Sequence, residues 1–420
     1  MSRRVFLYMD DVPRKTGSGA HLRFYSNVQA WLDLGYQAEI VHVCGPESPA
    51  VPLPPEWPGV TLTRIEAGPE AQDRGLPARL LYRAGWPLAP ALRYYFYKHA
   101  AVLQAARQRH RQDPAALHQF EGDSMANVIA DAGLGKLAIW SHHDIASAAI
   151  ASMIRIRCEQ EKRSLSRAEQ REIHFLRRYE QRVSARCPLV LCISEEDRDQ
   201  LRAQGWQNAE LLPMSIPDEE QVWQPHPPML AVTEHAPLRL LHLGKLGHLS
   251  SYRSLEFLLS RVLPLLSNGE RDLIRLSVVG GYETEEPRAA HILSLAKHFP
   301  RTVELLGFVP DLDPLYRDCH LQVVTSTDAS GLRTRIVESF ARGLPVLSTV
   351  QAAKGVAGLE PGSNILLADD AAGVAALLRK VLADPARLGA VAAKARETYM
   401  AFHSRAVVAR TLEGLLARLA

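Results

Sequence analysis

Residues 326–349 read STDASGLRTRIVESFARGLPVLST, and this stretch holds the order of elements that decides the fold. It begins at the end of an apolar run, turns at Gly331, continues as a helix with apolar residues at helical spacing, and stops at Gly343 before a second apolar run. Within the helix, Glu338 lies on the same face as Arg335 and Thr334. A strand, turn, helix and strand in this order predict an α/β fold with a parallel sheet, whose ligand site lies at the carboxyl ends of the strands.

The same alternation of short apolar runs and longer helical patterns extends along the chain in both directions. Because the chain has 420 residues, more than one hydrophobic core usually organises, we expect two such domains. Strands are predicted in the first half near 4–9, 38–43, 59–65, 116–120, 137–142 and 188–193, and in the second half near 238–243, 274–279, 302–306, 320–325 and 344–348. Helices are predicted at 20–34, 89–111, 147–184 and in the tail from about 385 to 420. The proline-rich segment around 213–237 interrupts all periodicity and predicts the linker between the domains.

The bulk composition excludes several classes of protein. Hydrophobic residues make up 47% and charged residues 23% of the chain, and the net charge is +3, which argues against a dedicated nucleic-acid binder. The five cysteines are scattered and form no C-x-x-C pair, so we expect neither a disulfide framework nor a zinc site of cysteines, and a reducing cytoplasm fits best. The chain starts directly on a strand-like run without a signal-peptide core, and no apolar stretch reaches the roughly 18 residues of a membrane-spanning helix.

The loop at residues 10–21, DDVPRKTGSGAH, follows the first predicted strand. Small residues at Gly17 and Gly19 let a ligand approach the backbone, and the helix that follows can offer free N–H groups to an anion. The loop is not the dinucleotide fingerprint, because Leu22 stands where the third glycine would be. A glycine-rich turn that only caps the helix is an equal alternative.

The sequence WSHHD at 140–144 ends another predicted strand. His143 beside Asp144 could position a substrate hydroxyl or phosphate, and Asp144 could equally cap the next helix. Because neighbouring residues of a strand point to opposite faces, at most one of His142 and His143 should face a ligand. A metal pair is disfavoured, since no cysteine or carboxylate stands at ligand spacing.

Residues 326–349 offer the most specific chemistry. The amides around Ser330, Gly331 and Leu332 suit a diphosphate, and Glu338, further into the helix, can accept hydrogen bonds from ribose hydroxyls. The alternative is an ordinary surface pair of Glu338 with Arg335, which helical spacing by itself would favour.

From Gly331 to Thr349 the sequence resembles the donor-site motif of the retaining glycosyltransferases of family 4, the group 1 glycosyltransferases, which have the GT-B fold. That motif reads Gly-x-x-x-(Lys/Arg)-x-x-Glu-(Ala/Ser)-(Met/Phe)-Ala-x-Gly-x-Pro-Val-(Val/Leu)-x-Thr. The resemblance covers nearly the whole chain and is weakest over 46–115. Its other segments are the glycine loop at Gly17 and Gly19, His143-Asp144, Arg178-Tyr179-Glu180 with residues 192–197, and the segments 211–213, 243–246, 278–281, 306–309 and 402–404.

The resemblance implies two Rossmann-like domains whose parallel sheets face a central cleft. Residues 1–213 would be the acceptor-binding domain, completed by the C-terminal helix 403–420, which crosses back to it. Residues 214–237 would be the linker, and residues 238–402 the domain that binds the nucleotide-sugar donor.

The resemblance also implies roles for individual residues. Lys245 and Arg335 would neutralise the leaving nucleotide diphosphate, so that no metal or other cofactor is required, and Glu338 would bind the ribose. His143 would be the fourth catalytic residue. The donor-binding residues would be Gly17, Gly19, Gly244, Phe308, Val309, Ser330, Gly331, Leu332 and Glu338. The expected activity is transfer of a hexose, with retention, from a nucleotide-diphosphate sugar to a glycan, glycolipid or polysaccharide acceptor.

One departure from the family pattern keeps two alternatives open. Many members carry a second glutamate seven residues before the ribose-binding one, and this chain has Ser330 at that position, with Asp328 two residues earlier. A GT-B-shaped binding or scaffold protein without turnover is therefore an alternative, and a nucleotide-sugar epimerase is a weaker one. The basic, aromatic stretch from 74 to 111 could contact a membrane surface at the inner face, but packing of its aromatic side chains into the core is the preferred interpretation.

Overall fold

The computed structural model describes residues 3–45, 47–67, 98–143, 146–223, 231–326 and 331–419. The chain divides into two compact units. Unit 1 comprises Met1–Pro217 and Val408–Ala420, and unit 2 comprises Asp218–Val407. The prediction of two α/β domains, each built on a parallel sheet, is confirmed.

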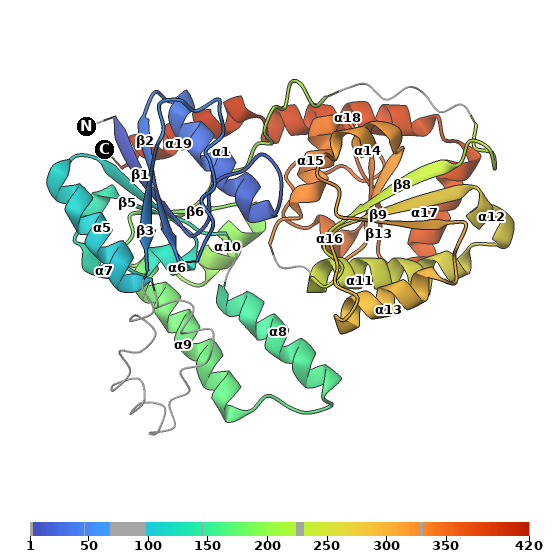
Figure 1. The fold of residues 1–420 in the computed structure, drawn as a ribbon, viewed down its shortest axis with the longest axis horizontal. Coiled ribbons are helices and arrows are strands. Elements are labelled where there is room, and N and C mark those ends of the chain that lie inside the picture. The colour runs from blue at the N-terminus through green and yellow to red at the C-terminus, as the bar shows by residue number, and fades with distance from the viewer. Residues whose placement is uncertain are drawn as a thin grey trace. The chain divides into compact units, whose positions relative to one another are not determined.

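Unit 1 contains a parallel sheet of seven strands in the order β3-β2-β1-β4-β5-β6-β7 (Figure 1). The order reverses between β1 and β4, which places the switch point of the doubly wound fold there. The strands are β1 Arg4–Met9, β2 Gln37–Cys44, β3 Thr61–Glu66, β4 Leu117–Glu121, β5 Ala138–Ser141, β6 Leu189–Cys192 and β7 Ala209–Leu211.

Both faces of this sheet are buried, which explains why β1 and β6 are nearly continuous apolar runs rather than alternating ones. On one face Phe6 and Tyr8 pack with Val102 of α5. On the other, Val5 packs with residues of α1 and with Leu412 of α19, so the C-terminal helix completes the core of unit 1. Unit 1 also contains the helices α6, α7 and α10. The bounds of all six are α1 Gly19–Asp33, α5 His99–Gln112, α6 Asp123–Ala126, α7 Ile129–Ala132, α10 Glu195–Ala203 and α19 Arg405–Ala417.

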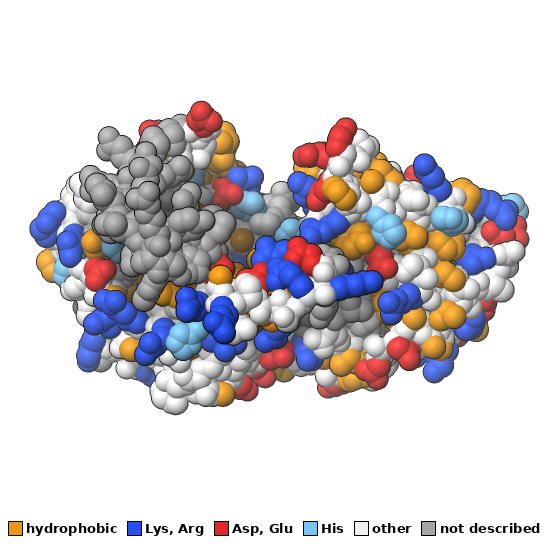
Figure 2. Space-filling view, turned by 90° about the horizontal axis from the view of Figure 1, so that it is seen from below, with side chains coloured by type: hydrophobic (Ala, Val, Ile, Leu, Met, Phe, Trp, Pro, Cys, Tyr) orange, Lys and Arg blue, Asp and Glu red, His pale blue; other side chains and the backbone are white. Residues whose placement is uncertain are grey.

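The prediction of one long helix from 147 to 184 is wrong, because two helices, α8 Ala146–Gln160 and α9 Arg167–Ser184, occupy this segment. The backbone turns at Lys162, whose φ is 50°, and Ser166 then caps α9 in a capping box with Glu169. Glu169 also accepts hydrogen bonds from Arg157 and Arg163, which ties the two helices into a hairpin that projects from unit 1 (Figure 1). On the side of unit 1 from which the hairpin projects, Lys and Arg side chains are more prominent than Asp and Glu side chains (Figure 2).

Unit 2 contains a parallel sheet of six strands in the order β10-β9-β8-β11-β12-β13, which reverses between β8 and β11. The strands are β8 Leu238–Leu243, β9 Ile274–Val279, β10 Val303–Gly307, β11 Leu321–Val324, β12 Val346–Thr349 and β13 Leu366–Ala368. The helices that cover its faces are α11 Leu249–Phe257 with a π turn at Leu258–Val262, α12 Asn268–Asp272, α13 Pro287–Ala296, α14 Asp313–Asp318, α15 Thr334–Arg342, α16 Val350–Ala353, α17 Ala371–Ala383 and α18 Arg387–Phe402.

The stretch that decides the fold behaves as its sequence predicts. Strand β11 ends at Val324, helix α15 starts at Thr334, and Gly343 ends it in the left-handed conformation, with φ of 71°. The amides of Gly343 and Leu344 then bond back to Phe340 and Ser339, which closes the helix before β12.

Among the described residues, no helix combines the length and the apolar character needed to cross a membrane. The stretch from 74 to 97, which carries most of the basic, aromatic sequence, lies outside the described residues. From position 98 onward the predicted helix 89–111 corresponds to α5.

Candidate functional site

In unit 2, the loops after β8 and β11 flank the point where the strand order reverses. Open parallel sheets bind their ligands at such a point, just beyond the carboxyl ends of the strands. Arg335 connects the segments that follow these two strands. It lies on α15, after β11, and its Nη1 donates a hydrogen bond to the carbonyl of Leu243 at the end of β8. The predicted residues Gly244, Lys245, Arg335 and Glu338 all belong to this part of unit 2.

The loop after β8 begins at Gly244, where no larger residue fits. Its φ is 141°, and a Cβ at this position would lie 2.1 Å from Oγ of Ser251 and 3.2 Å from Nη1 of Arg335. Gly280, after β9, is equally constrained, since its Cβ would lie 2.2 Å from the carbonyl oxygen of Gly244. The two glycines therefore let the loop fold closely against α11 and the Arg335 side chain.

The guanidinium of Arg335 is held in place on the protein side. Besides the bond to Leu243, its Nη2 lies 3.4 Å from Oγ of Ser251. Burial first, and then the neighbouring charge of Arg333, lower the pKa of Arg335 to about 10, so the group remains a cation at neutral pH. A cation fixed in a buried position acts more strongly on a nearby anion than a solvated one does.

Several further positive charges surround the same loop. The pKa of His248, at the start of α11, is lowered by partial burial and then by the charges of Arg335, Arg288, Arg333 and Lys245. Arg288 in addition donates a hydrogen bond to the carbonyl of Gly247 in this loop. This part of unit 2 is therefore suited to an anion with more than one charge.

Glu338 lies one turn further along α15 and is largely buried, with 17% of its side chain exposed. Among the described residues its carboxylate has one ion pair, with Nη1 of Arg342 at 3.9 Å. Arg342 itself is held elsewhere, by Asp313 at 3.2 Å and over the ring of Tyr316. Burial raises the pKa of Glu338, against the smaller opposing effect of Arg342 and Arg335. The carboxylate thus carries a desolvation cost that the described residues offset with one long ion pair, a state that suits a group that binds ligand hydroxyls.

The described part of the turn before α15 begins at Gly331. Gly331 adopts φ of 67°, and Arg333, at the N-cap position, makes no side-chain capping bond. Leu332 is nearly buried, and its carbonyl accepts a bond from Thr334. Ser330, which we predict to take part in donor binding, lies outside the described residues, as does Asp328.

Phe308 and Val309 follow β10 at the same edge of the sheet. Phe308 is 76% exposed, and a Cβ on Gly281, after β9, would lie 3.7 Å from its Cβ. Val309 instead packs with the buried cluster that includes Leu241 and Tyr316. An exposed aromatic ring at the ligand-binding edge of a sheet can stack on a planar base.

In unit 1, the glycine loop is occupied by the protein's own side chains. A Cβ on Gly17, whose φ is 120°, would lie 2.8 Å from Nδ1 of His21. That nitrogen accepts a hydrogen bond from the Ser18 amide, and Ser18 in turn accepts one from the amide of His21, which forms a capping box at the start of α1 beside Gly19. Asp11 fixes the other side of the ring at 2.7 Å. Two of the amides that we expected to be available to an anion are therefore bonded within the loop.

His143, at the end of β5, pairs with a carboxylate that the sequence analysis missed. Its Nε2 lies 2.8 Å from Oε2 of Glu121, the last residue of β4, and 20% of the His143 side chain remains exposed. Glu121 is fully buried and also accepts hydrogen bonds from Asn27 and Gln119. Its pKa is lowered because the bonds from its neighbours, led by His143, outweigh the cost of burial. Only the tertiary fold brings positions 121 and 143 together, although a carboxylate at the end of a predicted strand was a visible signal.

Part of unit 2 is similar in sequence to a known protein family. Residues 237–384 match the family described as Glycosyl transferases group 1. Sucrose-phosphate synthase from Thermosynechococcus elongatus superposes with a TM-score of 0.71 at 16% identity, covering 99% of this chain and 98% of that one. The chain resembles the group 1 glycosyltransferases and has the GT-B fold. No curated protein matches this GT-B chain in sequence.

Two further GT-B neighbours have been solved with nucleotide ligands. HepE from Anabaena, in complex with UDP-glucose, has a TM-score of 0.64 at 15% identity and covers 99% of each chain. The trehalose-6-phosphate structure from E. coli, bound with UDP-2-fluoro glucose, has a TM-score of 0.67 at 10% identity, covering 99% of this chain and 98% of that one. The matched family segment contains Gly244, Lys245, Arg335 and Glu338, whereas Gly17, Gly19 and His143 lie in the other unit, outside it.

Proposed function

We propose that this chain is a glycosyltransferase that moves a sugar from a nucleotide-diphosphate sugar to a glycan, glycolipid or polysaccharide acceptor. The observation that carries the proposal is the group of cations around the loop after β8, among them Arg335, which also lies near the largely buried carboxylate of Glu338 on α15. The cations fit a diphosphate and the carboxylate fits a ribose, and both lie in the segment that matches group 1 glycosyltransferases. Because two solved GT-B neighbours hold UDP-glucose or its fluoro analogue, UDP-sugars are the first donors to test.

In this proposal the chemistry is carried by side chains that stabilise the leaving group. Lys245 and Arg335 face the negative charge that grows on the diphosphate as the bond to the sugar breaks, so they stabilise the transition state more than the bound donor. We propose that these cations suffice without a metal ion or other cofactor. Transfer would proceed with retention, the acceptor approaching the face that the diphosphate leaves, and a phosphate oxygen taking the acceptor's proton.

In the other unit, His143 would contact the transferred sugar or the acceptor, and Glu121 would orient its ring. The 2.8 Å contact to a fully buried carboxylate fixes one ring nitrogen of His143 and leaves the other edge for a ligand. We propose that the chain acts in the cytoplasm, with or without peripheral contact at the inner membrane face.

A panel of donors tests the function directly. Thermal unfolding should be followed with UDP-, GDP- and ADP-glucose, because a ligand at about 100 times its Kd stabilises the folded protein by roughly 2.7 kcal/mol. We expect one nucleotide class to raise the Tm and to be hydrolysed or transferred by the same preparation. Binding without any turnover would support a scaffold protein instead, and conversion of the donor to another sugar nucleotide without an acceptor would indicate an epimerase. If no sugar nucleotide raises the Tm, the proposed function is wrong.

The cations around His248 predict a pH effect on donor binding. Partial burial first, and then these charges, hold the pKa of His248 below its ordinary value in the free protein, and a bound diphosphate would cancel part of the effect of the charges. The pKa of His248 should therefore rise on binding UDP, so that binding takes up a proton and affinity increases as the pH falls through the window between the two values. NMR titration of the imidazole, with and without UDP, measures both. A pKa that UDP leaves unchanged or lowers would contradict the placement of the diphosphate, and His298, at the end of α13, serves as the internal control.

A further inference from the structure

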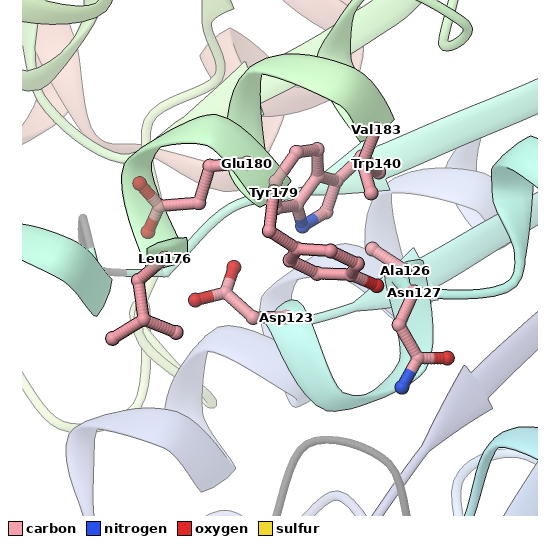
Figure 3. A pocket seen from close by; sticks show the side chains of 8 residues that line it. All are labelled: Asp123, Ala126, Asn127, Trp140, Leu176, Tyr179, Glu180 and Val183. Carbon is pink, nitrogen blue, oxygen red and sulfur yellow. The ribbon is translucent and has the colours of Figure 1, made fainter. Parts of the chain in front are cut away.

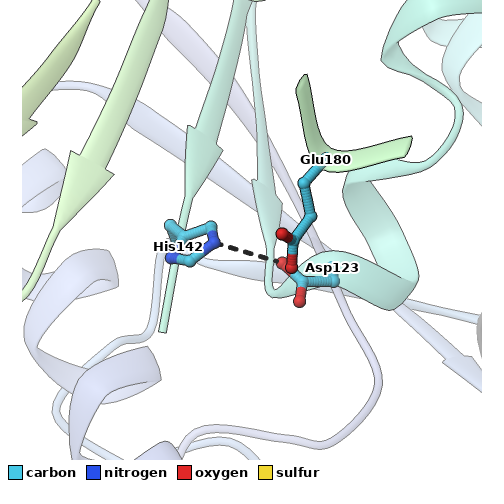
Figure 4. Close-up of side chains that lie close together, drawn as sticks. All are labelled: Asp123, His142 and Glu180. Atoms are coloured by element: carbon cyan, nitrogen blue, oxygen red, sulfur yellow. Dashed lines mark ion pairs between the residues drawn. The ribbon is translucent and has the colours of Figure 1, made fainter. Parts of the chain in front are cut away.

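A second group of chemically competent side chains lies in unit 1, close in sequence to Glu121 and His143 but made of other residues. Within the described residues, Asp123, His142 and Glu180 each offer one ligand atom, and these three atoms all lie within 4.8 Å of one another. Asp123 starts α6 after β4, His142 follows β5, and Glu180 comes from α9 (Figure 4). Three separate elements thus meet at one point.

The polar atoms at this point are only partly satisfied by the protein. Within the part of the chain that the structure describes, Nε2 of His142 and Oε2 of Glu180 have no hydrogen-bond partner, and the two residues are buried, at 1% and 2% exposed. The other oxygen of Glu180 accepts a hydrogen bond from the amide of Ser147 at 2.8 Å, which fixes the carboxylate. Nε2 of His142 lies 3.7 Å from Oδ1 of Asp123, beyond hydrogen-bond distance (Figure 4). Buried polar atoms without partners are costly, so such a cluster calls for a further occupant.

The surroundings hold the three side chains in place. The His142 ring packs edge-on against Trp140 and Trp206, with centroid distances of 4.9 and 5.7 Å. Asp123 and Glu180 line a small cavity together with Trp140 and Tyr179, with room for about one water molecule (Figure 3). The cluster is therefore a preformed and largely apolar-walled site rather than a set of mobile surface groups.

We propose that Asp123, His142 and Glu180 bind a divalent transition-metal cation, with Zn²⁺ as the best fit. One imidazole nitrogen and two carboxylate oxygens are ligands that Zn²⁺ accepts, and a tetrahedral site with bonds of about 2.0–2.2 Å needs ligand atoms roughly 3.3 Å apart. The three ligand atoms lie within 4.8 Å of one another, so they would move closer by up to about 1.5 Å on binding the ion. Mg²⁺ and Ca²⁺ prefer six or more oxygen ligands, which these three side chains do not supply. A water in the adjoining cavity would complete the four ligands.

The cation would have a structural role. It would join the ends of β4 and β5 to α9 and so anchor the base of the α8–α9 hairpin on the sheet. It would also hold His142, the residue next to His143, in place. The proposed sugar transfer has no step at this site. The inference does not depend on the proposed glycosyltransferase function.

The test uses the full-length, untagged chain, stripped with a chelator and then supplied with ZnCl₂. We expect one zinc per chain to survive desalting, and Zn²⁺ but not Mg²⁺ to raise the Tm. Glu180→Gln keeps the acceptor for Ser147 and the size of the side chain but loses the charge, and it should weaken zinc binding about tenfold or more. Co²⁺ in the wild-type protein should give the visible absorption bands of a tetrahedral site, which a merely structural hydrogen-bond network would not.

Glu169→Gln is the matched control, because Glu169 is another buried glutamate on α9, outside the cluster. It should retain zinc binding whatever it does to the Tm. Equal zinc affinity in the wild-type and Glu180→Gln proteins, or no zinc retained by the wild-type protein, would overturn the proposal. Should Glu180→Gln fail to fold, Asp123→Asn, at the rim of the cluster, gives the same comparison together with the Co²⁺ spectrum.

Discussion

Replacement of Lys245 by alanine should lower turnover by about 10²–10³-fold, the loss typical of removing one preorganised group that stabilises charge in a transition state. Lys245 is exposed in the loop after β8, and no described carboxylate pairs with it, so its charge is available to a ligand. Because that charge matters most as the diphosphate leaves, kcat should fall far more than affinity for the intact UDP-sugar. Steady-state kinetics and direct binding of the intact donor on the same preparation separate the two effects.

The stability of the Lys245→Ala protein provides a first control. An exposed lysine without an ion pair contributes little to folding, so the Tm should change by no more than that of Lys297→Ala, at the end of α13. Lys245→Arg should recover part of the lost rate, since it restores the charge with a different geometry. A near-normal rate for Lys245→Ala would show that the leaving group is neutralised elsewhere.

The fold was accessible from sequence because its signals are local. Gly331 and Gly343 stand at the turns that limit α15, and the apolar runs on either side become β11 and β12. The missed strands β7 and β13 have only three residues each, too few for periodicity to register. The break between α8 and α9 was readable, because Ser166 and Glu169 have the spacing of a capping box. Because helical periodicity continues on both sides of this break, the periodicity alone predicts one long helix.

The candidate sites were less accessible, because their contacts join positions that are far apart in the chain. Glu121 meets His143, and Asp123 and Glu180 meet His142, only because β4, β5 and α9 are neighbours in the folded unit. The absence of ligand spacing around His142 in the sequence disfavoured a metal, yet the fold supplies two carboxylates from other elements. Likewise, the space left by Gly17 is filled by the His21 ring, an arrangement that small residues alone do not reveal.

Replacement of Glu338 by glutamine should weaken donor binding by roughly 10–100-fold while leaving the protein at least as stable. Hydrogen bonds to a charged group contribute about 1.5–3 kcal/mol, and each 1.4 kcal/mol changes an affinity tenfold. Burial raises the pKa of Glu338, so the folded protein holds its ionised form at a cost. That cost is present at pH values where the carboxyl is ionised in the unfolded chain and disappears in the neutral glutamine variant, so the Tm should stay the same or rise.

A carboxylate with a purely structural role would give the opposite changes in Tm and in UDP affinity. If Glu338 served only the ion pair with Arg342, its loss would lower the Tm and leave UDP affinity unchanged, although at 3.9 Å that pair contributes little. Glu304→Gln, an exposed glutamate on β10 of the same sheet, is the matched control and should alter neither quantity. Calorimetric titration with UDP and thermal unfolding of the three proteins measure both quantities. A Glu338→Gln protein that binds UDP as tightly as the wild type would place the ribose elsewhere, and with it the donor site that Gly331, Arg335 and Lys245 are proposed to form.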